Sequence, residues 1–175
     1  MRRLASVTAL MSCIAVIAAG SAGSATSKST FLVFVEPTAS AASNGLTLET
    51  ELQGSFDVAA KSAEGEGEYA VTAGQTVLEE GTFELTRLVA FQFYGCGEVE
   101  GDTLPPDFCG GRAIFAVHAE SESGEEGDGL YEVNCQIHDP GGQTPPGTSE
   151  GVKVVARGIN FNRHVTGDNL FVMLP

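Results

Sequence analysis

The amino-acid sequence predicts an all-β protein, a single-domain antiparallel β-sandwich or β-barrel of about eight strands. Apolar and polar residues alternate along several segments, as in strands with one buried and one solvated face. Stretches rich in glycine, proline and acidic residues separate these segments at turn spacing. Beyond residue 25, no stretch of ten or more residues repeats its apolar positions with the 3.6-residue period of a helix.

The first 25 residues have the layout of a secretory signal peptide. Arg2 and Arg3 form a basic start, residues 4–19 an apolar run, and small residues at 20–25 offer a cleavage site. Because the run is shorter than the ~18–20 apolar residues that cross a bilayer, we expect no membrane span after cleavage. We therefore expect a secreted, extracellular protein. Residues 26–45 are expected to be a flexible lead-in with one short strand, and residues 46–175 the all-β domain.

The chain is strongly acidic, with 23 Asp and Glu against nine Lys and Arg and a formal net charge of −14. Removal of the signal peptide would leave seven basic residues and a net charge of about −16. Such a domain repels nucleic acid and anionic membrane surfaces, which excludes both as partners. The charge is typical of a domain kept soluble outside the cell, and attraction of cations or of a basic partner is the alternative.

Strand signals begin with an apolar run at residues 31–35, which we expect to stop at Pro37. From Leu46 the apolar residues fall on one parity, namely Leu46, Leu48, Leu52 and Phe56. Residues 61–68 are rich in Gly and Glu and are interpreted as a turn, after which alternation resumes at Tyr69. This pattern predicts a hairpin over residues 52–73.

The second half of the chain predicts further strands and two long loops. One strand covers residues 82–93, and others cover 113–120, 130–137 and 152–157. Residues 95–111 form a Gly/Pro loop that holds two cysteines, and residues 139–151 form another. The turn at residues 166–169 is expected to join residues 161–165 and 170–174 in a closing hairpin.

The cysteines predict one disulfide. Cys13 would leave with the signal peptide, and Cys96 and Cys109 lie in one glycine-rich loop of an exported chain. We expect these two to pair, and a pairing through Cys135 is the alternative. Cys135 shares the apolar parity of its strand and is therefore interpreted as a buried thiol.

No metal site and no cofactor are predicted. Cys135 and His138 have the spacing of a metal half-site, but side chains three residues apart on a strand point to opposite faces. The second ligand pair of a structural zinc site is missing. Dinucleotide, phosphate-loop and hydrolase-elbow motifs are also missing after the signal peptide.

Arg87 stands out because it falls on the apolar parity of residues 82–93. A bulge that turns it outward is one interpretation. The other is a buried ion pair that lines an interior cavity, because an unpaired buried charge is costly. The candidate cavity-lining residues are Phe83, Arg87, Phe91 and Phe93.

These features favour a secreted, non-catalytic module that binds a partner. The partner is either a small molecule or a protein, and the sequence does not identify it. One alternative is a small β-barrel enzyme of cyclase or isomerase type with an apolar cavity, since such enzymes need few motif residues. Another is a secreted inhibitor or surface protein that acts through the 95–111 loop. A closed cavity lined by these candidate residues would favour a ligand carrier or an enzyme, whereas a filled core with a rigid, prominent 95–111 loop would favour a binding or inhibitory module.

Overall fold

The computed structural model describes residues 30–99, 102–137 and 149–175. No helix occurs among them, so none of these residues belongs to a helix that could cross a membrane. The strands are β1 (Thr30–Ala42), β2 (Leu46–Asp57), β3 (Ser62–Ala73), β4 (Thr76–Cys96), β5 (Glu98–Val99), β6 (Asp102–Thr103), β7 (Phe108–Ser121), β8 (Glu126–Cys135), β9 (Gly151–Ala156), β10 (Ile159–Thr166) and β11 (Asn169–Met173).

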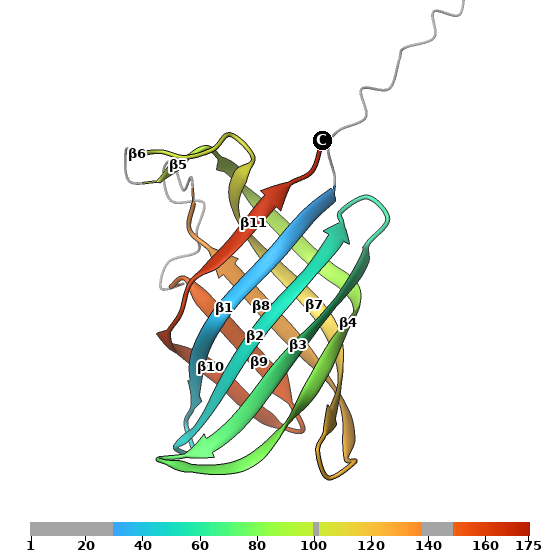
Figure 1. Ribbon diagram of the computed structural model, residues 1–175, viewed down its shortest axis with the longest axis vertical. Helices are drawn as coiled ribbons and strands as arrows, with labels where there is room; N and C mark the ends of the chain where they lie inside the picture. Colours follow the sequence, from blue (N-terminus) through green and yellow to red (C-terminus); the bar gives the residue numbers. More distant parts are fainter. Residues whose placement is uncertain (1–29, 100–101, 138–148) are drawn as a thin grey trace, which may run out of the picture.

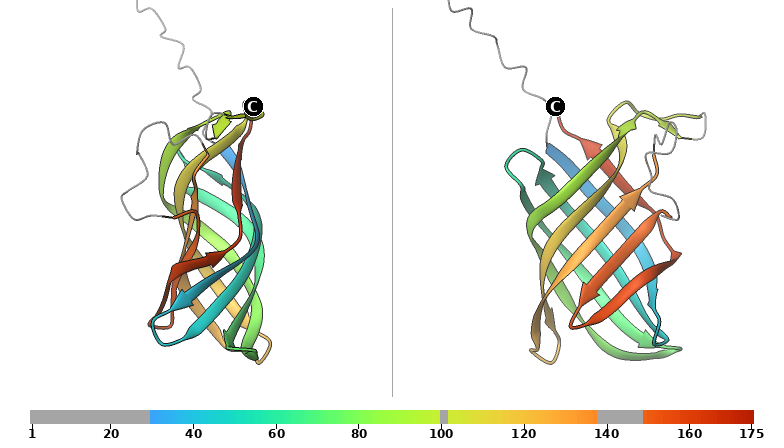
Figure 2. Two further views of the ribbon diagram at one scale, coloured as in Figure 1. Left: turned by 90° about the vertical axis from the view of Figure 1, so that its left-hand side faces the viewer. Right: turned by 180° about the vertical axis from the view of Figure 1, so that it is seen from behind.

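Nine of these strands form one antiparallel sheet, and eight of the nine close into a ring (Figure 1). Strands that follow one another in the chain are neighbours from β1 to β4 and from β7 to β10, and β4 pairs with β7. The ring closes where β10 pairs with β1. The predicted all-β fold is confirmed, and a barrel is the form it takes. Figure 2 shows its tilted strands from the side and from behind.

The last two strands do not form the expected hairpin. Both β10 and β11 pair with β1, at residues 39–42 and 31–35 respectively, so they run one after the other along the same neighbour. The residues that connect β10 to β11 pack closely against β1. A Cβ atom on Gly167 would lie 2.4 Å from the side chain of Thr38, and the hydroxyl of Thr38 donates to the carbonyl of Thr166 at 2.6 Å. Glycine is therefore required where the chain passes Thr38.

The first strand is longer than the sequence predicts. It continues past Pro37 to Ala42, so residues 38–42, expected as loop, belong to the ring. The register with β2 shifts between Val35 and Thr38, which places Pro37 in a bulge. Proline has no N–H to donate, and a bulge is one of the few places where a strand tolerates it.

Residues 62–68, expected as part of a turn, are the start of β3, and the turn itself covers residues 58–61. Their glutamates alternate with glycines, and Glu64, Glu66 and Glu68 are exposed. A Cβ atom on Gly67 would lie 2.4 Å from the ring of Phe83. The Gly/Glu pattern is therefore strand alternation in which glycine makes room for an aromatic ring on the inside.

Strand β4 changes its inward-facing parity because of β-bulges. Register shifts against β7 occur between Leu85 and Arg87 and between Leu88 and Ala90. Leu85 and Leu88 are both buried, although they lie three residues apart. Each extra residue turns the following side chains to the other face of the sheet.

Both ends of the described chain lie at the same end of the barrel (Figure 1). Aromatic rings pack inside this half. Phe56 lies at their centre and is 1% exposed. Its ring centroid lies 5.0–5.6 Å from those of Phe31, Phe91, Phe115 and Phe171. These rings pack around Phe56 from several strands and form the core of this half.

Candidate functional site

The other half of the barrel contains a partly open, mostly apolar cavity of about 240 Å³. Its wall comes from inward-facing side chains of the ring strands, among them Leu46, Leu48, Val71, Val117, Val154 and Phe161. Four small residues, Ala119, Gly127, Gly129 and Ala156, line the same space on β7, β8 and β9. Because these positions carry little or no side chain, the barrel interior is hollow here, while aromatic rings fill it at the other end.

The inner part of the cavity carries two buried hydroxyl groups. The rings of Phe83 and Tyr131 stack with centroids 5.0 Å apart, and both line the cavity. The hydroxyl oxygens of Tyr131 and Thr50 lie 2.8 Å apart and share a hydrogen bond. Burial raises the pKa of Tyr131 above its ordinary range, so the phenol keeps its proton. The wall thus presents neutral polar groups within an otherwise apolar surface.

The rim of the cavity is formed by a charged cluster. The Tyr69 hydroxyl donates to a carboxylate oxygen of Glu79 at 2.7 Å. The Nη1 atom of Arg157 lies 3.2 and 3.3 Å from the two oxygens of Glu79 and 3.1 Å from an oxygen of Glu125. Burial and then the hydrogen bond to Glu79 raise the pKa of Tyr69, so this phenol is also protonated. One cation and two carboxylates leave the rim with a net negative charge.

Arg157 holds its position at a conformational cost. Its φ is 49°, and the following Gly158 has a φ of 77°, so the two residues form the tight turn between β9 and β10. Asn and Gly are the residues that favour such a turn. An arginine there costs on the order of 1 kcal/mol in backbone strain. In return its side chain bridges Glu79 and Glu125 across the rim.

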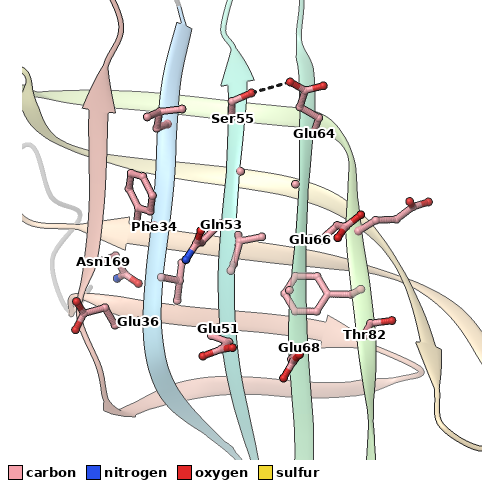
Figure 3. A pocket seen from close by; sticks show the side chains of 18 of the residues that line it. Phe34, Glu36, Glu51, Gln53, Ser55, Glu64, Glu66, Glu68, Thr82 and Asn169 are labelled. Atoms are coloured by element: carbon pink, nitrogen blue, oxygen red, sulfur yellow. Dashed lines mark hydrogen bonds between the residues drawn. The ribbon is translucent and has the colours of Figure 1, made fainter.

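The outer face of β1–β4 forms a second, open concavity, which is acidic (Figure 3). Eight carboxylates line it, including Glu36, Glu51, Glu64, Glu66, Glu68 and Glu84, with no Lys or Arg among its described lining residues. Like charges face one another in the strand pairs Glu51–Glu68 and Glu66–Glu84. Such pairs destabilise a sheet. The described lining of this face therefore carries a strong excess of negative charge.

The structure brings only part of the candidate cavity-lining set to the cavity. Phe83 lines it. Phe91 packs instead against Phe31, Phe56 and Phe171 in the filled half. Phe93, at the end of β4, is 45% exposed.

Arg87 is exposed, since the bulge after Leu85 turns it to the outer face. The bulge interpretation is therefore the correct one, and the buried ion pair is not present. As a candidate cavity-lining residue, Arg87 is corrected: it does not line the cavity, because the bulge breaks the two-residue period that put it on the apolar parity.

The cysteines are arranged as expected. The sulfur atoms of Cys96 and Cys109 lie 1.93 Å apart, at bonding distance. Cys135 is a free, buried thiol whose Sγ lies 3.2 Å from the carbonyl oxygen of Asn169. Burial raises the pKa of Cys135 to about 12, so the thiol is unreactive near neutral pH.

His138 of the Cys-x-x-His half-site lies outside the described residues. Among the described residues, no group of three or more His, Cys, Asp or Glu is arranged to hold a metal ion.

The residues that carry polar groups into the cavity, Thr50, Tyr69 and Tyr131, were not singled out by the sequence analysis. A signal for Thr50 does exist, because it falls on the apolar parity of β2 between Leu48 and Leu52. A polar residue in such a position either finds a buried partner or faces a ligand.

The chain has no match among models of known families, among curated proteins or among solved structures. Its function therefore has to rest on its own geometry.

Proposed function

We propose that the protein is a non-catalytic binding protein that holds a small, mostly apolar molecule inside the barrel. The observation that carries this proposal is the 240 Å³ apolar cavity with a few convergent polar groups. Pockets of this composition are the usual sites of small-molecule binding. The cavity also favours a ligand carrier over an inhibitor that acts through residues 95–111.

The size of the cavity limits the ligand. An apolar cavity of roughly 150 Å³ is enough for one benzene molecule. A volume of about 240 Å³ therefore suits a compact molecule of one substituted ring. Burial of its surface would supply roughly 25 cal/mol for each Å² removed from water.

The proposed place of action is outside the cell. The signal-like N-terminus lies outside the described residues, so this part of the proposal rests on the sequence and on the disulfide pair. Disulfides form and persist in oxidising compartments such as the extracellular space.

An enzyme of cyclase or isomerase type is the second candidate, and one observation favours it. The Glu79 carboxylate lies at the rim of the cavity, held by the Tyr69 hydroxyl, where it is placed to act as a general base. A carrier releases its ligand unchanged, whereas an enzyme converts it and loses turnover in Glu79→Gln.

Binding is tested by titrating the protein with ethylbenzene in a calorimeter. Ala119→Leu extends a side chain into the cavity, and Ala116→Leu makes the same change on the outward side of the same strand. Heat of binding is expected for the wild type and for Ala116→Leu, with affinity lost or at least roughly tenfold weaker in Ala119→Leu. Equal binding by both variants, or no binding by the wild type, would contradict the proposal.

A further inference from the structure

The hydroxyl pair inside the cavity has hydrogen-bonding capacity that the protein does not use. Each of Thr50 and Tyr131 carries one donor hydrogen and two acceptor lone pairs. Their mutual hydrogen bond uses one of the two hydrogens, because only one hydroxyl can donate to the other. In the described part of the chain, neither side chain makes another hydrogen bond. One hydroxyl hydrogen is therefore left to point elsewhere.

A buried donor without an acceptor is costly, by about 1–3 kcal/mol. A water molecule is a poor partner here, since a buried water needs two to four polar contacts. The rest of the nearby wall is apolar, including Leu48, Val117 and the ring of Phe83. A ligand that brings one acceptor oxygen and is otherwise apolar would satisfy both parts of the wall.

The charge of the ligand is restricted as well. A carboxylate inside the cavity would be a buried charge without a described cation beside it, since Arg157 at the rim already pairs with Glu79 and Glu125. The net negative charge of the rim repels an anion further. An acceptor that is neutral, such as a carbonyl or ether oxygen, avoids both costs.

We propose that Thr50 and Tyr131 are the polar anchor of the cavity, and that the ligand class is small neutral molecules with one hydrogen-bond-accepting oxygen, such as aryl or cyclic ketones. This inference rests on the proposed function, because it names the ligand class of the same cavity. The anchor donates its free hydroxyl hydrogen to the ligand oxygen, and the apolar wall surrounds the remainder.

The test compares acetophenone, ethylbenzene and benzoate as ligands of the full-length protein by calorimetry. Acetophenone and ethylbenzene share a ring and a two-carbon substituent, so they differ by the carbonyl oxygen. We expect acetophenone to bind roughly 3- to 10-fold more tightly than ethylbenzene, because this is the gain in affinity that one neutral hydrogen bond supplies. Benzoate is expected to bind at least roughly tenfold more weakly than acetophenone.

The double variant Thr50→Val/Tyr131→Phe removes both hydroxyls and nearly keeps their shapes. Replacing both partners of a buried hydrogen bond is close to neutral for stability, whereas removing one partner is not. The double variant should lose the preference and bind ethylbenzene at least as tightly as acetophenone, because the buried carbonyl then has no donor. Thr47→Val is the control, because it makes the same change on the outward side of β2, away from the cavity lining, and should keep the preference for acetophenone.

The outcomes separate this inference from the proposed function. If ethylbenzene binds but acetophenone gains nothing, or if the double variant keeps the preference as Thr47→Val does, the anchor is refuted and the binding function stands. If no neutral ligand binds, both proposals fail.

A measurement on the unmodified protein covers the case in which the double variant does not fold. The carbonyl ¹³C resonance of bound, labelled acetophenone should move downfield of its position in an apolar solvent, as it does when the oxygen accepts a hydrogen bond. An unmoved resonance would overturn the anchor.

Discussion

The hydroxyl oxygens of Thr50 and Tyr131 lie 2.8 Å apart, although 81 residues separate them in the chain. Thr50 belongs to β2 and Tyr131 to β8, two strands that are not neighbours in the sheet. They meet because the ring closes and brings opposite walls of the barrel together. This hydrogen bond joins two facing walls of the barrel beside the cavity, and it leaves one of the two hydroxyl hydrogens for a ligand.

Phe56 should be the most sensitive position of the filled half. Phe56→Ala removes a ring that is 1% exposed and stacks or packs edge-on against four others, so we expect a loss of about 3–5 kcal/mol in the free energy of unfolding. Chemical denaturation measures it. Phe93→Ala is the control, since Phe93 is 45% exposed and should cost less than about 1 kcal/mol. Equal losses would mean that the aromatic cluster is not the core.

His118 should titrate above its ordinary pKa. The hydrogen bond of its Nδ1 to Asp128, at 2.9 Å, is the main cause of the raised pKa, and the nearby carboxylates Glu126 and Glu84 add to it. The protonated ion pair therefore stabilises the fold below about pH 6.5, and this stabilisation is lost as the pH rises through the raised pKa. An NMR titration should show the pKa falling clearly in Asp128→Asn and less in Glu126→Gln. An unchanged pKa in Asp128→Asn would contradict this account.

The Cys135 thiol should be protected in the folded protein. With a pKa of about 12 and a side chain that is fully buried, it should not react with iodoacetamide at pH 8. After denaturation without reduction, the peptide that contains Cys135 should be alkylated. Cys96 and Cys109 should be alkylated only when the denatured protein is also reduced. Mass spectrometry of the peptides distinguishes these cases. Rapid labelling of Cys135 in the native protein would place it at the surface.

Arg157→Asn should change ligand exchange more than stability. Asparagine relieves roughly 1 kcal/mol of turn strain, which offsets the loss of surface ion pairs worth about 0–1 kcal/mol. Because the rim loses its bridging guanidinium, we expect ethylbenzene to dissociate faster from the variant, as NMR exchange can measure. Lys61→Asn is the matched control. Lys61 also has a left-handed φ, of 53°, but lies in the turn before β3, away from the cavity. A similar rate change in both variants would refute a role of the rim.

Much of the fold could be predicted from alternation alone. The apolar parity of Leu48, Leu52 and Phe56 correctly identified the inner face of β2. The prediction failed where the backbone leaves a regular period, as at the bulges of β4 that turn Arg87 outward and Leu88 inward. A bulge is set by the fit to the partner strand, which is not visible in the local sequence.

The candidate site was less accessible from the sequence. The sequence correctly placed Phe83 on the cavity wall. The contact between Thr50 and Tyr131 depends on barrel closure, and no local sequence pattern indicates which strands face each other across the interior. The closing strands were misjudged for a related reason. Residues 166–169 have hairpin-turn composition, but the room made by Gly167 for Thr38 lets the chain continue along β1.

The central claim is that a small apolar molecule occupies the barrel interior. The most direct test is to record nuclear Overhauser effects between acetophenone and assigned methyl groups of the protein. We predict contacts to Leu48, Val117 and Val154, which line the cavity, and none to Val33 or Val133 in the core outside its lining. Contacts confined to outward-facing methyl groups, or no contacts at all, would contradict an interior binding site.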